Sequence, residues 1–326
     1  MRVVTTNCRA PQIGPASAPA RSPTRDATSG RTGRPARGRP RGPRQSPPGP
    51  RWPSASTAGS GRQPTAYSWD PAPVRVLLLG GTSEASALAR RLAGRSDLEL
   101  TTSLAGLTAE RAPLPGEVRI GGFGGSEGLR AYLERTGVDV VIDATHPFAR
   151  RMRWHAAEAC DALGLPRVRL ERPPWTPEDG DSWTPVPTVE AAADAVWDAS
   201  RVFLTIGRRE LAPFARHPHV WFLVRAIHPP EGLALQHVHV VLARGPFAED
   251  DERRLLVEHR IDTLVTKNSG GDAAAAKLAA ARALGVRVVI VERPPSPPGP
   301  SAQTVDEAVD WLSRTRPDRT AAGYTP

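Results

Sequence analysis

Short runs of apolar and β-branched residues alternate with segments of helical periodicity along most of the chain. The first run is Val74–Leu79, and further runs predict strands near 98–103, 117–120, 138–142 and 166–170. Helical periodicity falls near 83–93, 126–135 and 148–163. Strands that alternate with helices indicate a parallel sheet with helices on its faces. Residues 74–175 are therefore predicted to form an α/β domain with five parallel strands.

A second set of elements follows the first. Strands are predicted near 201–206, 220–226, 238–242, 261–265 and 286–291. Helices are predicted near 188–199, 208–216, 248–258, 271–284 and 304–314. This pattern predicts a second five-stranded α/β domain over residues 176–300, followed by a C-terminal helix within 301–314.

The two halves resemble each other in sequence. Residues 161–174 and 282–295 share a helix end, a glycine, a strand and a Glu-Arg-Pro-Pro exit. Matching strands in the two halves are preceded by Val138-Asp139 and Ile261-Asp262. Matching helices open with Thr188-Val189-Glu190 and Thr304-Val305-Asp306. Matches in the same order indicate two related domains. A Pro-rich linker joins them, and a cleft between two domains is a favoured ligand site.

The positive charge of the chain is concentrated at one end. Residues 1–73 contain 12 Arg, no Lys and 2 Asp, whereas the remainder is close to neutral. This Pro-, Gly-, Ser- and Arg-rich segment has little apolar periodicity, so it is predicted to be a disordered extension, as is the tail 315–326. A valine codon can initiate translation in bacteria, so we expect a chain that starts at Val74 to fold and to keep its activity.

Several function classes are disfavoured by composition. The basic extension lacks the aromatic interleaving of single-strand nucleic-acid binders, and no apolar run has the length of a membrane span. The segment after Met1 does not have the apolar core of a signal peptide. Two cysteines, Cys8 and Cys160, make neither a disulfide framework nor a zinc site. We therefore expect a cytoplasmic protein without a metal site, a nucleic-acid partner or a membrane partner.

Gly80-Gly81-Thr82-Ser83 joins the first strand to the first helix. Glycines allow a phosphate to approach the backbone, and a helix N-terminus offers free N–H groups and partial positive charge. Ser83 is a candidate N-cap. A plain tight turn before a capped helix explains the same residues equally well, because the pattern is not the G-x-G-x-x-G fingerprint.

Lys267-Asn268-Ser269-Gly270-Gly271 joins a buried strand to a helix in the second half. An ammonium, an amide, a hydroxyl and two glycines at one helix start suit a phosphate or carboxylate. The alternative is a capped helix with an exposed lysine.

His146 follows another buried strand, in the segment Asp143–Phe148. It is a candidate for hydrogen bonding or proton transfer near neutral pH, and a structural, hydrogen-bonded histidine is the alternative. Arginines near these strand ends, Arg150, Arg208 and Arg225, are candidates for binding substrate carboxylates.

Four loops together resemble those of precorrin-6A reductases, including cobalt-precorrin-6A reductases. Gly80–Ala85, Asp143–Ala149, Gly245–Phe247 and Thr266–Gly271 are similar to loops of that family in the same order, and the similarity spans about residues 74–314. Gly207–Leu211 departs from the Gly-Ser-Lys-like loop expected there.

The resemblance implies two flavodoxin-like, Rossmann-like domains with the active site between them. It implies an oxidoreductase that acts on a CH–CH bond, with NADPH (or NADH) donating hydride to a tetrapyrrole in cobalamin synthesis. The catalytic residue would be His146, with water or a substrate carboxyl as alternative proton donors. The cofactor would be held by Gly80, Gly81, Thr82, Ser83, Lys267, Asn268, Ser269 and Gly270, and the substrate by Arg150, Arg208 and Arg225. Other enzymes of the pathway are candidate partners for substrate transfer.

Two other functions fit a chain with two similar lobes. One is a tetrapyrrole enzyme that needs no cofactor, such as a cyclising synthase, and the other is a non-catalytic binding module. Tight binding of NADPH would argue against the synthase, and a binding module would need no phosphate loop.

Overall fold

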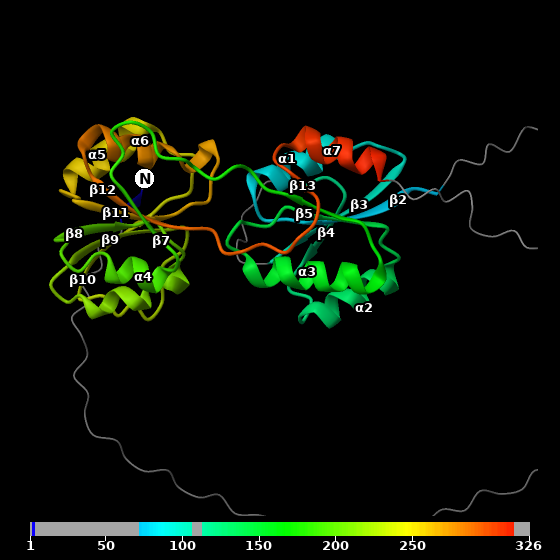
Figure 1. Ribbon diagram of the computed structural model, residues 1–326, viewed down its shortest axis with the longest axis horizontal. Helices are drawn as coiled ribbons and strands as arrows, with labels where there is room; N and C mark the ends of the chain where they lie inside the picture. Colours follow the sequence, from blue (N-terminus) through cyan, green and yellow to red (C-terminus); the bar gives the residue numbers. More distant parts are fainter. Residues whose placement is uncertain (1, 4–71, 106–112, 316–326) are drawn as a thin grey trace, which may run out of the picture. The chain divides into compact units, whose positions relative to one another are not determined.

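The computed structural model describes residues 2–3, 72–105 and 113–315, in which the strands form two sheets (Figure 1). The first sheet is parallel throughout and has the order β4 (Glu117–Ile120), β3 (Leu98–Leu104), β2 (Val74–Leu79), β5 (Val140–Asp143), β6 (Arg167–Leu170) and β13 (Ser301–Ala302). The second has the order β1 (Arg2–Val3), β10 (His237–Leu242), β9 (Trp221–Ala226), β8 (Arg201–Leu204), β11 (Thr263–Lys267), β12 (Arg287–Val291) and β7 (Trp183–Val186).

Strand order distinguishes the sheets from the flavodoxin-like arrangement that the resemblance implies. Counted along the chain, the first sheet reads 3-2-1-4-5-6, which is the Rossmann order. Strands β8 to β12 repeat that order in the second sheet, with β7 in the sixth position. The α/β class with two similar domains is confirmed, and the order is Rossmann-like.

The sixth strand of each sheet follows, in sequence, the fifth strand of the other sheet. β7 follows β6 in sequence but pairs with β12, and β13 follows β12 but pairs with β6. The prediction of five strands in each sheet was therefore wrong. The four residues of β7 and the two of β13 have too little periodicity to stand out in the sequence.

Helices cover both faces of the first sheet (Figure 1). α1 (Ser83–Leu92) and α7 (Val305–Arg314) lie on one face, and α2 (Ser126–Thr136) and α3 (Arg150–Leu163) on the other. Val76 and Leu78 of β2 contribute to the first core, and Leu77 and Leu79 to the second. A strand covered on both faces reads as a continuous apolar run because alternate side chains point to opposite cores.

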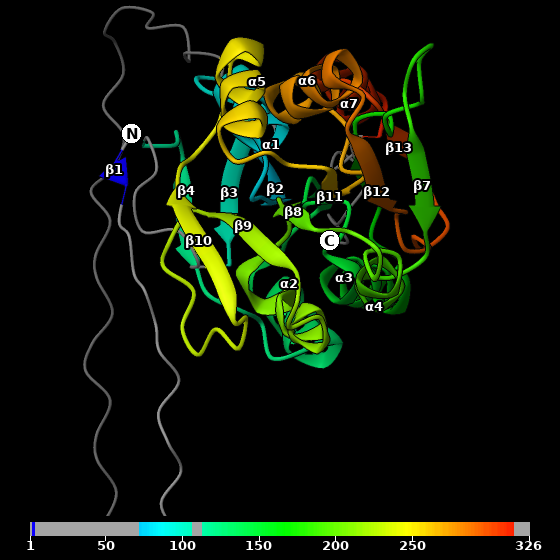
Figure 2. The ribbon, with the colours of Figure 1, turned by 90° about the vertical axis from the view of Figure 1, so that its left-hand side faces the viewer.

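The second sheet is covered in the same way (Figure 2). α5 (Glu249–Glu258) and α6 (Ala276–Leu284) lie on one face, and α4 (Val189–Asp194) lies on the other. The predicted helix 208–216 consists of two 3-10 helices, η1 (Arg208–Glu210) and η2 (Ala212–Arg216). The predicted helix 271–284 begins with a third, η3 (Asp272–Ala274), which precedes α6.

The repeated residues have the same structural roles in both halves. The Asp139 carboxylate accepts from the backbone N–H of Arg75, at the start of β2, and the Asp262 carboxylate accepts from that of Arg201, at the start of β8. Thr188 and Thr304 both cap their helices, α4 and α7, through the side-chain hydroxyl. Equivalent contacts at equivalent positions support a common origin of the two halves.

The predicted extension and tail lie mostly outside the described residues. Arg2–Val3 forms β1, which pairs antiparallel with β10, and this strand was not predicted. Residues 1, 4–71 and 316–326 of these segments are not described.

Candidate functional site

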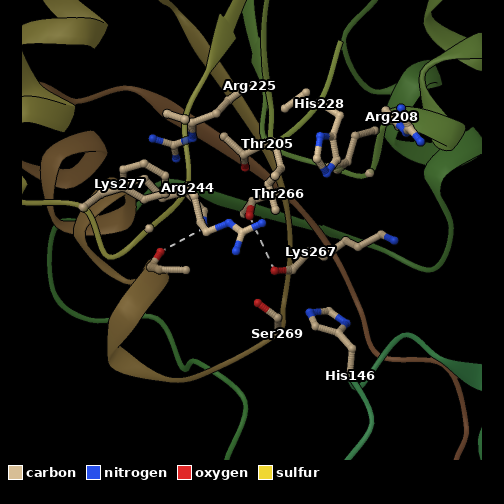
Figure 3. A pocket seen from close by; sticks show the side chains of 18 residues that line it. His146, Thr205, Arg208, Arg225, His228, Arg244, Thr266, Lys267, Ser269 and Lys277 are labelled. Carbon is tan, nitrogen blue, oxygen red and sulfur yellow. Dashed lines mark hydrogen bonds between the residues drawn. The ribbon is translucent and has the colours of Figure 1, made fainter. Parts of the chain in front are cut away.

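A cavity of about 500 Å³ opens at the carboxyl ends of four strands of the second sheet (Figure 3). Among the described residues, its lining comes from the ends of β9 and β11, from the residues that follow β8, β9, β10 and β11, and from the start of α6. His146 joins this lining from the loop after β5 of the first sheet. β8 and β11 are the neighbouring strands at which the order of the sheet reverses. Ligands of open α/β sheets bind at such a position.

The lining of the cavity is strongly basic. It includes five Arg and Lys side chains, and none of the eighteen described lining residues is Asp or Glu. A cavity with this lining favours a ligand that bears several negative charges. The five basic residues are Arg208, Arg225, Arg244, Lys267 and Lys277.

Two of these cations have carboxylate partners behind the lining. Arg225 forms a two-pronged ion pair with Glu252, whose side chain is 2% exposed, and its guanidinium lies 3.8 Å from the ring centroid of Phe247. Lys267 donates to Glu210 over 2.6 Å, and its Nζ lies 4.8 Å from the ring centroid of Phe148. These contacts hold both side chains in place, and an incoming anion would share Lys267 with Glu210.

Lys277 is a buried lysine in the cavity wall. Its side chain lies at the start of α6, donates to the Ala274 carbonyl over 2.8 Å and faces the Trp175 ring at 4.8 Å. Burial lowers the pKa of Lys277 to about 7, and the nearby charge of Arg225 acts in the same direction. The ammonium therefore loses its proton in the physiological range, and an anion in the cavity would favour the charged form.

His146 reaches the cavity from the loop after β5. Its Nδ1 accepts from the backbone N–H of Phe148 over 3.2 Å, which leaves Nε2 as the protonated nitrogen of the neutral ring. Burial, and then the positive charges of Arg172 and Lys267, lower the pKa of His146 to about 4. At neutral pH this ring is a hydrogen-bond donor and carries no charge.

The glycine loop after β2 is built as a helix start. The Thr82 hydroxyl accepts from the Ala85 N–H over 3.1 Å and donates to the Ala144 carbonyl over 2.9 Å. The N-cap is therefore Thr82 and not Ser83. Gly81 has a φ of +136°, and a Cβ there would meet no atom within 4 Å. The backbone is thus accessible to a ligand, although this loop does not line the cavity of the second sheet.

The glycines after β11 face the chain itself. A Cβ on Gly270 would lie 2.0 Å from the Pro173 carbonyl oxygen, and one on Gly271 would lie 2.5 Å from the Arg172 side chain. The Asn268 amide is bound by the backbone N–H and carbonyl of Trp175. These residues pack against the linker between the halves.

The predicted site residues therefore divide into groups. His146, Arg208, Arg225, Lys267 and Ser269 line one cavity. Arg150 is exposed at the start of α3 and is not part of that lining. The lining also includes Arg244, Lys277 and His228, to which the sequence assigned no role.

Two further observations concern the described residues alone. No group of three or more His, Cys, Asp and Glu side chains among them has the arrangement of a metal site. None of their helices is long and apolar enough to cross a membrane.

Comparison with known proteins gives consistent results. A family model described as precorrin-6x reductase CbiJ/CobK matches residues 75–313. A precorrin-6A reductase of Mycobacterium tuberculosis is 50% identical over 73% of this chain and 97% of its own length. A cobalt-precorrin-6A reductase of Priestia megaterium is 28% identical over 73% and 97%, respectively. A solved structure of CobK precorrin-6A reductase superposes with a TM-score of 0.71 at 44% identity, over 74% of this chain and 97% of that one.

Proposed function

Because the chain belongs to the precorrin-6x reductase family of cobalamin biosynthesis, we propose that it reduces precorrin-6A with NADPH as the hydride donor. The reaction adds a hydride to one carbon of a conjugated C=C bond of the macrocycle and a proton to its neighbour. NADH is the alternative donor. The observation that carries the proposal is the basic cavity at the strand ends of the second sheet.

The substrate is proposed to bind in that cavity. A corrin precursor bears many acetate and propionate carboxylates, and five basic side chains with no acid in the described lining provide complementary charge. Arginine forks bind carboxylates with two parallel hydrogen bonds, which fixes orientation as well as position. Arg208, Arg225 and Lys267 are proposed to contact the substrate, and the structure adds Arg244 and Lys277 as candidates.

The cofactor phosphates are proposed to bind at Gly80, Gly81, Thr82 and Ser83. Gly81 faces open space, and the N-terminus of α1 adds partial positive charge, whereas the glycines after β11 are covered by the linker. This contrast favours the first loop for the phosphates. Asn268, Ser269 and Gly270 then position Lys267 and the cavity wall. When bound, the reduced nicotinamide supplies the hydride, and the protein fixes its distance to the acceptor carbon.

His146 is proposed to orient the substrate by hydrogen bonding. Its ring is neutral at pH 7 because its pKa is about 4, so it holds no readily donated proton. A group with a pKa near the working pH is better suited to proton transfer. Lys277, with a pKa of about 7, is a lining residue that meets this condition.

The substrate is proposed to lack cobalt. The relatives with 44–50% identity are named precorrin-6A reductases, and those named cobalt-precorrin-6A reductases are 27–30% identical. A cytoplasmic location and substrate transfer from other enzymes of the pathway are proposed with it.

Deuterium labelling tests the proposal directly. The protein is incubated without oxygen with precorrin-6A and NADPH that carries deuterium at the transferring position of the nicotinamide. We expect one deuterium in the reduced macrocycle by mass spectrometry. Reduction without deuterium transfer would contradict the assigned hydride source, and no reduction would contradict the assigned substrate.

A further inference from the structure

An arginine lies at each of the two places where the chain passes from one sheet to the other. Arg172 follows β6 and Arg293 follows β12, each within a Glu-Arg-Pro-Pro sequence. Both side chains are largely buried, with 16% exposed. Neither is among the lining residues of the basic cavity.

The Arg172 guanidinium joins two functional loops. Its Nη1 donates to the Glu84 carboxylate over 2.6 Å, and Glu84 lies in the first turn of α1, directly after the glycine loop. Its Nε donates to the backbone carbonyls of Ser269 and Gly270 over 2.9 and 2.8 Å. One rigid, planar group thus connects the strand-end loop of β2 with that of β11.

A second arginine holds the β11 loop from the other linker. Arg293 donates through Nε to the Asn268 carbonyl over 2.9 Å and through Nη2 to the Ser269 carbonyl over 3.0 Å. Its Nη1 donates to the Arg172 carbonyl over 2.9 Å. Three consecutive carbonyls of the loop, 268 to 270, therefore accept hydrogen bonds from linker arginines, so the linkers hold the loop that contains Ser269 and directly follows Lys267.

The contact between Glu84 and Arg172 is an ion pair at neutral pH. Burial alone would raise the pKa of Glu84, but its backbone hydrogen bond at the helix start and the charge of Arg172 lower it overall. The Glu84 side chain is 23% exposed. Separating the loops would leave two partly buried charges without partners, which is unfavourable.

We propose that Arg172 is a positioning residue that sets the glycine loop of the first sheet against the Lys267–Gly271 loop of the second. This inference rests on the proposed function, in which the first loop holds the reductant and the second adjoins the macrocycle. Hydride transfer depends steeply on the distance and angle between donor and acceptor. Arg172 therefore supports turnover without touching either ligand.

Arg172→Lys is the principal test, because it keeps the positive charge and removes the fork. We expect kcat to fall by about ten- to a hundredfold, in line with the cost of roughly 1 Å of misplacement, while KM for NADPH changes by less than about threefold. Hydrogen–deuterium exchange of the ligand-free protein should rise in both 80–86 and 267–271. Arg282→Lys is the matched control, since Arg282 is also forked, to Asp181, but contacts neither loop.

Glu84→Gln provides a milder second variant that keeps the bonds from Arg172 to Ser269 and Gly270. We expect faster exchange in 80–86 alone and a smaller fall in kcat. Glu127→Gln, which removes a first-turn acid from α2, controls for the general effect on a helix start.

The inference is overturned if correctly folded Arg172→Lys or Glu84→Gln keeps the wild-type kcat and the wild-type rate of hydrogen–deuterium exchange in the affected loops. It is also overturned if the control of that variant, Arg282→Lys or Glu127→Gln, changes by the same amount. If the wild-type protein does not reduce precorrin-6A, the proposed function fails, and the exchange measurements still decide whether Arg172 couples the loops.

Discussion

Lys277 should make ligand binding depend on pH in a way that no arginine can. The side chain is 5% exposed in the cavity wall, and burial lowers its pKa to about 7. It is charged below that pH and neutral above it, so a corrin with many carboxylates should bind more weakly as pH rises from 6 to 8. A charge-assisted hydrogen bond contributes roughly 1.5–3 kcal/mol. Its complete loss corresponds to about a ten- to a hundredfold loss of affinity, which is reached only well above pH 8. Between pH 6 and 8 the protonated fraction of the free lysine falls from about 90% to about 10%, so the affinity should fall by at most about tenfold over this interval.

Calorimetric titration with a reduced corrin at constant ionic strength measures how binding affinity changes with pH. The substitution Lys277→Met should remove this pH dependence. The variant should bind at every pH with the affinity of the wild type at high pH. His228 also lines the cavity, so His228→Asn serves as a matched control, and it should keep the pH dependence of binding. Arg208→Gln should weaken binding at all pH values equally. A step that persists in Lys277→Met would refute the assignment.

Three other substitutions test separate parts of the structure. Lys267→Ala should weaken binding of the corrin by about tenfold or more in calorimetry, because a charged donor is lost, and Glu210→Gln should strengthen it by removing the competing carboxylate. Between pH 6 and 8, where the wild-type ring is neutral, His146→Gln should raise the KM for the macrocycle more than it lowers kcat. A fall in kcat without a change in KM would instead indicate that His146 donates the proton. Glu171→Gln should lower the free energy of unfolding, measured by urea denaturation, by about 3–5 kcal/mol, because three largely buried arginines lose their carboxylate partner. Glu99→Gln, at an exposed ion pair, should change the free energy of unfolding little.

The fold class followed from the sequence because buried parallel strands leave a strong signal. β2 and β5 are covered on both faces, so they appear as unbroken apolar runs between helical patterns. The pairing of β7 with β12 and of β13 with β6 left no such signal in the sequence. Pairing between distant strands is decided by tertiary contacts, and Ser301–Ala302 is too short to show a period.

Residues of the candidate site could be predicted from the sequence where they lie at the end of a predicted strand. Arg208, Arg225 and Lys267 were found in this way, and all three line the cavity. Lys277 was missed because a lysine in an alanine-rich helix reads as a solvated residue. The partners of Lys267 and Gly270, which are Glu210 and the linker, also escaped detection, because these contacts join residues far apart in the chain.

The most direct test of the account is anaerobic turnover of precorrin-6A, with NADPH oxidation and the macrocycle followed together. We expect one NADPH to be consumed for each macrocycle reduced, and no conversion when the cofactor is omitted. Conversion of the macrocycle without NADPH would indicate a cofactor-independent tetrapyrrole enzyme. Tight binding of the macrocycle without conversion, in the presence of NADPH, would indicate a binding module and would contradict the reductase assignment.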